Sequence, residues 1–425
     1  MENAMRRNAV NVSPRFALLL CLLFIPHFAM GQQATWIATW TASPEAADPD
    51  PNEGLLNLND QTVRERVRVT VGGERIRIRL SNECSSVPVL VGRVRVGVAQ
   101  SAASVVPGLL RRVTFGGDDA ILIPPGAPAL SDPVDFPISS GSEISISIYF
   151  PKRPTSITWH SLAMKRAVIS THGDHTQDVA IQDGKESDSS AFLSAVFVPE
   201  QVHRHVIVAF GDSIVDGDGS TPETDRNWPI DLFRRLEKAH LGSQFAVVNE
   251  GIAGNRLLSD GPIASLGISA LTRFDRDALS VPGVTHVVLL EGANDIGFPG
   301  AKLRDFSLAP AANAPTVEDI IGAYRQLISR AHARGIRIIG CTIMPSEGVT
   351  IPGYHTEAKE RMRQSVNQWI RTSRAFDGVI DFDAVVRDPD HPSRLLPRLA
   401  SEDHLHPNDI GYQTMADAIN LSLFQ

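Results

Sequence analysis

Short apolar segments alternate with longer amphipathic ones throughout the second half of the chain, and this alternation constrains the fold most. The apolar segments have strand length and cover residues 206–210, 245–249, 285–290, 336–343 and 379–382. The helical patterns cover about residues 228–241, 316–334, 356–372 and 407–421. Short strands that alternate with helices predict a parallel sheet with helices on both faces, which is an α/β/α arrangement.

The first half follows a different pattern, in which polar and apolar side chains alternate with a period of two. The clearest runs cover residues 62–71, 75–80, 91–98 and 143–150. Gly72 and Gly73 separate the first two runs, and a Gly-Gly pair at such a position predicts a two-residue hairpin. We therefore expect an antiparallel β-sandwich or jelly-roll-like domain in this half.

The N-terminus has the pattern of a secretory signal peptide. Arg6, Arg7 and Arg15 precede an apolar core at residues 16–25, which is too short to span a bilayer as a stable helix. Small residues follow, so cleavage is expected before Gln32, although an uncleaved membrane anchor is an alternative. We expect a signal peptide at 1–31, a β-domain at 32–200 and an α/β domain at 201–425, in a secreted or periplasmic protein.

Charge and cysteine content narrow the possible partners. The formal net charge of the 425 residues is -8, which argues against nucleic acid or an anionic membrane as partner. Arg64, Arg66 and Arg68 recur at every second position and are interpreted as the solvated face of a strand. Cys84 and Cys341 fall in different predicted domains, so no disulfide is expected between them. The oligomeric state is left open.

Polar residues follow the predicted strands at the points where active sites of parallel sheets lie. Ser213 follows the first strand and is the candidate nucleophile, which needs a base to remove its proton. His406 is the candidate base, because an imidazole titrates near neutrality. Asp403, three residues earlier in the sequence, is expected to orient the Nδ1 side of that ring.

An oxyanion hole requires N–H donors that face the developing negative charge. The candidates are the backbone N–H groups of Ser213 and Gly254 and the side-chain amide of Asn294. Each of these residues is also an ordinary turn residue, and His406 could simply precede a helix that begins at Pro407. His404 is the alternative base. The four sites together, in order and at strand ends, favour the catalytic interpretation.

These residues also resemble a known family. Gly211-Asp212-Ser213, Gly254, Gly292-Ala293-Asn294-Asp295 and Asp403-His404-Leu405-His406-Pro407 are similar to the four sequence blocks of SGNH (GDSL) hydrolases. The resemblance implies a flavodoxin-like three-layer α/β/α fold and hydrolysis of carboxylic esters without a metal or other cofactor. It implies catalytic roles for Ser213, Asp403 and His406, and oxyanion roles for Ser213, Gly254 and Asn294.

The expected function is that of a secreted serine esterase acting on short-chain or acetylated carbohydrate esters through an acyl-enzyme. A lysophospholipase or long-chain acylhydrolase is one alternative. A non-catalytic carbohydrate- or surface-binding protein is another, in which Trp36, Trp40 or Trp159 would contact glycans, although such residues more often belong to a core. His172 and His175 are interpreted as part of a polar turn and not as metal ligands.

Overall fold

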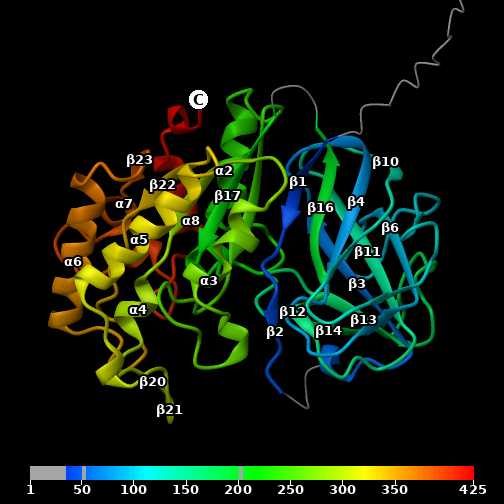
Figure 1. Cartoon of the computed structure of the whole chain (residues 1–425), viewed down its shortest axis with the longest axis horizontal. Coiled ribbons are helices and arrows are strands. Elements are labelled where there is room, and N and C mark those ends of the chain that lie inside the picture. Colours follow the sequence, from blue (N-terminus) through cyan, green and yellow to red (C-terminus); the bar gives the residue numbers. More distant parts are fainter. Residues whose placement is uncertain (1–34, 50–53, 201–203) are drawn as a thin grey trace, which may run out of the picture. The chain divides into compact units, whose positions relative to one another are not determined.

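The structure is a computed structural model, and it describes residues 35–49, 54–200 and 204–425. Figure 1 shows the arrangement of its helices and strands. The predicted signal peptide at 1–31 lies outside the described residues. Within the described part, no helix combines the length and the apolar character that crossing a membrane requires. Residues 35–425 form one compact unit, so the two halves of the described chain pack together.

A five-stranded parallel sheet organises the second half of the chain. Its order is β18-β17-β19-β22-β23, and each neighbouring pair runs parallel. The strands are β17 (His205–Gly211), β18 (Phe245–Gly251), β19 (Val284–Leu290), β22 (Arg337–Cys341) and β23 (Gly378–Ile380). The chain leaves β17 to form one neighbour, β18, and then crosses to the other side to form β19. The carboxyl end of β17 is therefore the topological switch point, where open α/β sheets bind ligands.

Helices cover both faces of this sheet, as the sequence predicts. One face packs on α2 (Trp228–Lys238), α7 (Phe382–Val386) and α8 (Asp409–Ala418) through a core that includes Ile207 and Ala209. The other face packs on α3 (Ala270–Phe274), α5 (Val317–His332) and α6 (Glu357–Thr372) through Val208 and Phe210. Alternate residues of β17 thus enter opposite cores, which confirms the three-layer α/β/α prediction.

The first half is built mainly from antiparallel sheets, also as predicted. One sheet has the order β1-β16-β4-β10, with β9 also paired to β4. Its strands are β1 (Trp36–Thr41), β16 (Leu193–Pro199), β4 (Gly73–Ser81), β10 (Val134–Ile138) and β9 (Pro128–Leu130). The second sheet has the order β14-β13-β3-β11-β6-β7. Its strands are β14 (Lys185–Ser187), β13 (Ala167–His172), β3 (Gln61–Arg68), β11 (Glu143–Phe150), β6 (Arg93–Val98) and β7 (Arg111–Val113).

Apolar residues of both sheets share one core, which makes this half a sandwich. A smaller sheet has the order β15-β12-β2 and consists of β15 (Ser190–Ala191), β12 (Thr158–His160) and β2 (Glu45–Ala46). Two short antiparallel pairs complete the described strands: β5 (Val89–Val91) with β8 (Ile121–Ile123), and β20 (Lys302–Leu303) with β21 (Phe306–Ser307).

The predicted hairpin at Gly72-Gly73 is wrong. Strands β3 and β4 lie in different sheets, so the glycines carry the chain from one sheet to the other. Beyond Arg68 the backbone N–H groups of Val69 and Thr70 donate to the carbonyls of Ser142 and Thr39, outside any ladder with β4. A Cβ atom at Gly72 would lie 2.4 Å from the Ile138 carbonyl oxygen, so the crossing requires glycine.

The interpretation of Arg64, Arg66 and Arg68 as a solvated face is also wrong. The Arg64 side chain is fully buried and donates to the carbonyls of Ala103 and Asp178. Arg66 and Arg68 are partly buried and form ion pairs with Glu143. Surrounding segments cover this face of the sheet, which the period-two pattern cannot reveal because it reports only alternation between faces.

Helix boundaries agree with the sequence at some ends and differ at others. The predicted helix at 316–334 is α5, and Thr316 caps it with a full capping box. The last helix, however, is capped by Asn408 and begins at Asp409, so Pro407 does not occupy its first position. The strand predicted at 379–382 ends at Ile380, because Asp381 caps the short helix α7.

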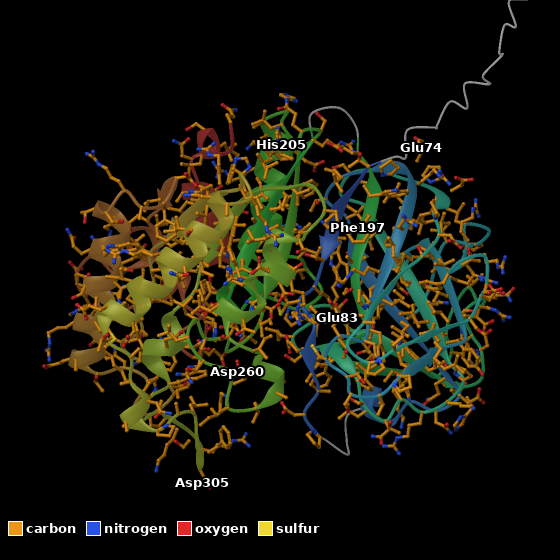
Figure 2. The ribbon with its side chains drawn as sticks, viewed as in Figure 1. Glu74, Glu83, Phe197, His205, Asp260 and Asp305 are labelled. Carbon is orange, nitrogen blue, oxygen red and sulfur yellow. The ribbon has the colours of Figure 1, made fainter. Side chains whose placement is uncertain are left out.

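The change from antiparallel to parallel architecture falls between β16 and β17. Figure 2 labels Phe197 on β16 and His205 at the start of β17, one on each side of this change. The halves make direct contacts, such as the hydrogen bond from the Thr41 hydroxyl to the Asn249 carbonyl at 3.1 Å. The domain boundary at 200/201 stays a prediction.

Candidate active site

The end of β17 turns sharply into a one-turn helix, and this turn positions Ser213. The Asp212 carboxylate accepts a hydrogen bond from the Ile214 N–H at 3.0 Å and caps α1 (Ser213–Asp216). Gly211 is required before the cap, since a Cβ atom there would lie 1.9 Å from the Leu290 carbonyl oxygen. Ser213 therefore occupies the first helical position at the switch point of the sheet, where its N–H has no partner within the helix.

The structure brings His406 and Asp403 to Ser213. Ser213 Oγ lies 2.8 Å from His406 Nε2, and His406 Nδ1 lies 2.5 Å from Asp403 Oδ2. Because a carboxylate faces Nδ1, that nitrogen carries the proton and Nε2 is free to accept the serine proton. The other Asp403 oxygen accepts hydrogen bonds from the Ser401 hydroxyl and from the N–H groups of Leu405 and His406.

The electrostatic surroundings favour a charged histidine next to a charged aspartate. Burial disfavours the imidazolium of His406, but the Asp403 hydrogen bond and the carboxylates of Asp218 and Asp403 outweigh it, so the pKa of His406 is raised above 6.5. Burial likewise opposes the charged form of Asp403, yet its bonds to His406 and Ser401 hold its pKa well below the ordinary value. Asp403 thus stabilises the imidazolium that proton transfer from Ser213 creates.

Gly254 occupies a tight turn after β18. The Asn255 N–H donates to the Ile252 carbonyl at 3.1 Å, and Gly254, the third residue of this turn, has φ +72. This left-handed backbone favours glycine, and a Cβ atom would also lie 2.7 Å from the Leu266 side chain. Among the described residues, neither the Gly254 N–H nor the Ser213 N–H has a hydrogen-bond acceptor.

Asn294 lies on the short helix α4 (Ala293–Gly297) that follows β19. Its Nδ2 donates to the Asn255 carbonyl at 2.9 Å, and its Oδ1 accepts from the Tyr354 hydroxyl at 2.9 Å. These two bonds fix the orientation of the amide and leave the second Nδ2 hydrogen available for a substrate. The predicted donors therefore come from the ends of three adjacent strands, β17, β18 and β19.

His404, the alternative base, is exposed and has a left-handed backbone with φ +59. It takes no part in the Ser213–His406 pair.

His172 and His175 lie at a polar turn, where His175 Nδ1 lies 2.7 Å from Asp178. Trp159 is buried, and Trp36 and Trp40 pack against the apolar core. Cys84 and Cys341 are free thiols, and Cys341 is buried.

The structure adds Arg273 to the site, which the sequence did not reveal. This buried guanidinium donates to the carbonyls of Gly211 and Glu250 at 2.7 and 2.9 Å, and to the Asn255 Oδ1 at 2.8 Å. It also lies over the Phe210 ring at 4.0 Å. Arg273 thus joins the ends of β17 and β18 beneath the nucleophile. The segment that carries it shows no motif, so no sequence signal identified it.

Asp295 is a second residue that supports the site. Its position directly after Asn294 in the sequence is a signal that could have identified it. Its carboxylate accepts from the N–H groups of Leu257 and Leu258 at 2.6 and 2.9 Å. Burial raises the pKa of Asp295 to about 6 despite these bonds. Asp295 therefore ties the chain that follows the Gly254 turn to the helix that carries Asn294.

The α/β half of the chain resembles known proteins. Residues 209–414 match the GDSL-like Lipase/Acylhydrolase family. No curated protein matches the sequence. Similar solved structures include a GDSL-like lipase from Bacteroides thetaiotaomicron, with 17% identity, a TM-score of 0.35, and coverage of 52% of this chain and 87% of that one.

Two further structures are the psychrotrophic esterase EstA from a Pseudoalteromonas species and a mutant of Axe2, an acetyl-xylooligosaccharide esterase from Geobacillus Stearmophilus. EstA has 20% identity and a TM-score of 0.35, over 50% of this chain and 93% of that one. Axe2 has 19% identity and a TM-score of 0.36, over 52% of this chain and 94% of that one. By its family match, the region 209–414 of this chain belongs to the GDSL-like lipases and acylhydrolases, and the protein is a carboxylic ester hydrolase.

Proposed function

We propose that the protein is a secreted serine esterase that cleaves short-chain acyl or acetylated carbohydrate esters through an acyl-enzyme on Ser213. The observation that carries this proposal is the continuous series of contacts from Ser213 Oγ to His406 Nε2 at 2.8 Å and from His406 Nδ1 to Asp403 at 2.5 Å. A serine hydroxyl needs such a base, and the base needs such an orienting carboxylate.

In the acylation step, Ser213 Oγ attacks the acyl carbon while His406 Nε2 takes the hydroxyl proton. The negative charge develops on the former carbonyl oxygen, which the N–H groups of Ser213 and Gly254 and the Asn294 amide would stabilise. When the C–O bond to the alcohol breaks, the imidazolium returns the proton to the leaving oxygen. The alcohol departs and an ester between the acyl group and Ser213 remains.

Deacylation repeats these steps with water. His406 removes a proton from a water molecule that attacks the acyl carbon, and the same donors stabilise the second oxyanion. Collapse of this intermediate breaks the bond to Ser213, and the imidazolium returns the proton to Oγ. The carboxylic acid leaves and the free enzyme is restored, so no cofactor is consumed.

A small cavity lined by sequence neighbours of the catalytic residues supports the proposal of a short acyl group. The cavity measures about 20 Å³. Its lining includes Ile214, Ala293, Leu405 and Tyr354, together with the charged residues Lys359, Glu360 and Arg363. Ile214, Ala293 and Leu405 are sequence neighbours of Ser213, Asn294 and His406. A cavity needs about 10–15 Å³ of such volume to hold one water molecule. A cavity of about 20 Å³ therefore accommodates a methyl-sized group but not a long chain.

A chain-length series of p-nitrophenyl esters, together with acetylated sugars, tests the substrate class. We expect kcat/KM to be highest for acetate and to fall steeply from butyrate onward. The alternative, a lysophospholipase or long-chain acylhydrolase, predicts the opposite order. A Ser213→Ala variant should abolish turnover of every ester in the panel. Near-wild-type turnover in that variant would contradict the catalytic proposal itself.

Export is part of the proposal and is supported by the N-terminal sequence pattern alone. Expression of the full chain in a bacterial host with a Sec pathway should give a mature protein that begins at Gln32. N-terminal sequencing of the cell-free or periplasmic fraction checks this. Retention of residues 1–31 on a membrane-bound protein would favour the uncleaved anchor.

A further inference from the structure

Asp216 joins two parts of the proposed active site. It is the last residue of α1, the helix that begins with Ser213, and its side chain is buried. Its Oδ2 accepts a hydrogen bond at 3.1 Å from the N–H of Ala253, the residue before Gly254. A Cβ atom at Gly251 would lie 2.3 Å from the Asp216 nitrogen, so glycine there lets α1 rest directly on β18. Asp216 thus links the nucleophile helix to the Gly254 turn.

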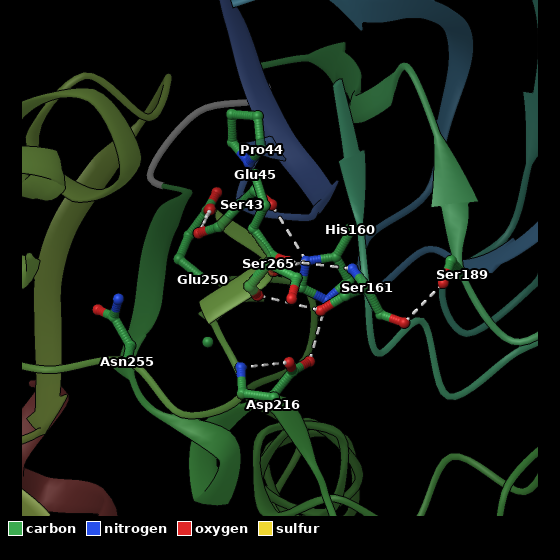
Figure 3. A network of polar contacts seen from close by, with 12 residues as sticks. Ser43, Pro44, Glu45, His160, Ser161, Ser189, Asp216, Glu250, Asn255 and Ser265 are labelled. Carbon is green, nitrogen blue, oxygen red and sulfur yellow. Dashed lines mark hydrogen bonds and ion pairs between the residues drawn. The ribbon is translucent and has the colours of Figure 1, made fainter. Parts of the chain in front are cut away.

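The other oxygen of Asp216 contacts a residue from the antiparallel half of the chain. Asp216 Oδ1 lies 3.1 Å from Nε2 of His160, which belongs to β12. Nδ1 of the same ring lies 3.0 Å from the Ser43 carbonyl oxygen and 3.3 Å from Glu45 Oε1. Figure 3 shows His160 between Glu45 and Asp216, with the Glu250–Ser43 pair alongside.

Both ring nitrogens of His160 therefore face acceptors, and only the imidazolium has a proton for each. Burial disfavours this cation, but Asp216 and Glu45 outweigh it, and the pKa of His160 is raised well above 6.5. Burial in turn raises the pKa of Asp216, and the contact with His160 opposes that rise. The contact with His160 on one oxygen and with the Ala253 N–H on the other holds the Asp216 side chain in one orientation.

A second connection from the antiparallel half reaches the same turn. The Asp48 carboxylate accepts from the N–H groups of Ala264 and Ser265 at 2.8 and 2.9 Å. These residues belong to the short helix η2 (Ala264–Leu266), and Leu266 is the side chain that packs against Gly254. The backbone around Gly254 is thus supported from two sides by residues outside the family match at 209–414: by His160 through Asp216, and by Asp48 through η2.

We propose that His160 is a positioning residue of the esterase: through Asp216 and Ala253 it fixes the Gly254 N–H in the oxyanion hole. The inference rests on the proposed function, because it assigns His160 a role in that reaction. Oxyanion donors act only when they lie 2.7–3.1 Å from the charge that develops, and a misplacement of about 1 Å costs on the order of 10²-fold in rate. The antiparallel half would then complete the active site and not merely accompany it.

Three variants of the full-length enzyme test this role. His160→Gln keeps a polar side chain but cannot donate toward Glu45 and Asp216 at once, and Asp216→Asn removes the charge that faces His160. His175→Gln is the matched control, since His175 also lies in the antiparallel half but is bonded to Asp178. The fraction of active enzyme is measured first, by the burst of an active-site titrant, so that misfolded protein does not count as lost catalysis.

Per active site, we expect His160→Gln and Asp216→Asn to lower kcat about 10- to 100-fold with KM within threefold. An alkyl boronic acid forms a tetrahedral adduct with the nucleophile and mimics the oxyanion, so its affinity should fall in parallel with kcat/KM. His175→Gln should match the wild type in both. If His160→Gln yields too little folded protein, the cavity of about 90 Å³ that borders His160 and Asp216 permits rescue of His160→Ala by added imidazole.

The inference would be overturned if His160→Gln and Asp216→Asn kept wild-type kcat and boronate affinity per active site. This includes the case in which total activity falls only because fewer enzyme molecules are titratable. Absence of imidazole rescue in a folded, titratable His160→Ala variant would also count against it. These results differ from failure of the proposed function, in which the wild type would lack esterase activity or Ser213→Ala would keep it.

Discussion

The Nε2 atom of His406 lies 3.6 Å from Oδ2 of Asp218, on the side of the ring that also contacts Ser213. The Asp218 side chain is 43% exposed, so solvent screens part of its charge. Its carboxylate still favours the imidazolium and is among the causes that raise the pKa of His406. The neutral ring is the base, so activity should fall as pH decreases through a value above 6.5.

Replacement of Asp218 by Asn removes one of the charges that favour the imidazolium. The pKa of His406 should fall, and the acidic limb of the kcat/KM profile should move to lower pH while the alkaline plateau changes little. A pH–rate series on p-nitrophenyl acetate measures this. Asp305→Asn, in the turn between β20 and β21 (Figure 2), is the charge-matched control. An unchanged acidic limb in Asp218→Asn would exclude this electrostatic role.

Asp403→Asn tests the orientation of the base. The Asn carbonyl can still accept from Ser401, Leu405 and His406 as Asp403 Oδ1 does, so the loop should keep its fold. Its amide, however, would face Nδ1 with a donor and would favour the wrong tautomer. We expect kcat to fall at least about 10²-fold with an unchanged circular dichroism spectrum. A loss below tenfold would contradict the orienting role.

Asn294→Ala removes a proposed oxyanion donor. Loss of one such donor typically costs about 3 kcal/mol of transition-state stabilisation, so kcat should fall about 10²-fold or more with little change in KM. Tyr354→Phe is the informative comparison. It removes one bond to Asn294 Oδ1 but leaves Nδ2 held by the Asn255 carbonyl, so its effect should be smaller. Equal losses in the two variants would argue against direct donation by Asn294.

Arg273→Met tests the support beneath the nucleophile. The change removes the guanidinium donor to the Glu250 carbonyl and one of two donors to the Gly211 carbonyl, which keeps its bond from the Ile252 N–H. It also removes a buried partner of Asp277. Loss of one partner from a buried charge network costs about 3–5 kcal/mol in the free energy of unfolding, which urea denaturation measures. Arg361→Met, at a side chain that is 72% exposed, should cost less than about 1 kcal/mol.

Much of the α/β half could be predicted from sequence because its local signals agree with its tertiary structure. The apolar runs at 206–210 and 287–290 are buried on both faces, and a strand buried in this way must be continuously apolar. The capping box formed by Thr316 and Asp319 also marks the start of helix α5. The polar residues at strand ends were predictable for a related reason, since all parallel strands end at the same edge.

The parts that the sequence did not reveal depend on long-range contacts. Gly72-Gly73 marks a turn, but only the packing against Ile138 decides that the turn joins two sheets. Arg64 alternates like a surface residue and is buried because distant carbonyls accept from it. Arg273 and His160 bind partners that lie far away in the sequence, and no local pattern encodes such pairs.

The central claim is that Ser213 forms the covalent intermediate, and covalent labelling tests it most directly. The enzyme is treated with a fluorophosphonate probe, and the modified residue is located by peptide mass spectrometry. We predict stoichiometric labelling of Ser213, loss of esterase activity in proportion to the label, and neither label nor turnover in Ser213→Ala. Labelling of a different residue, or full activity in an enzyme that carries no label on Ser213 after treatment, would contradict the claim.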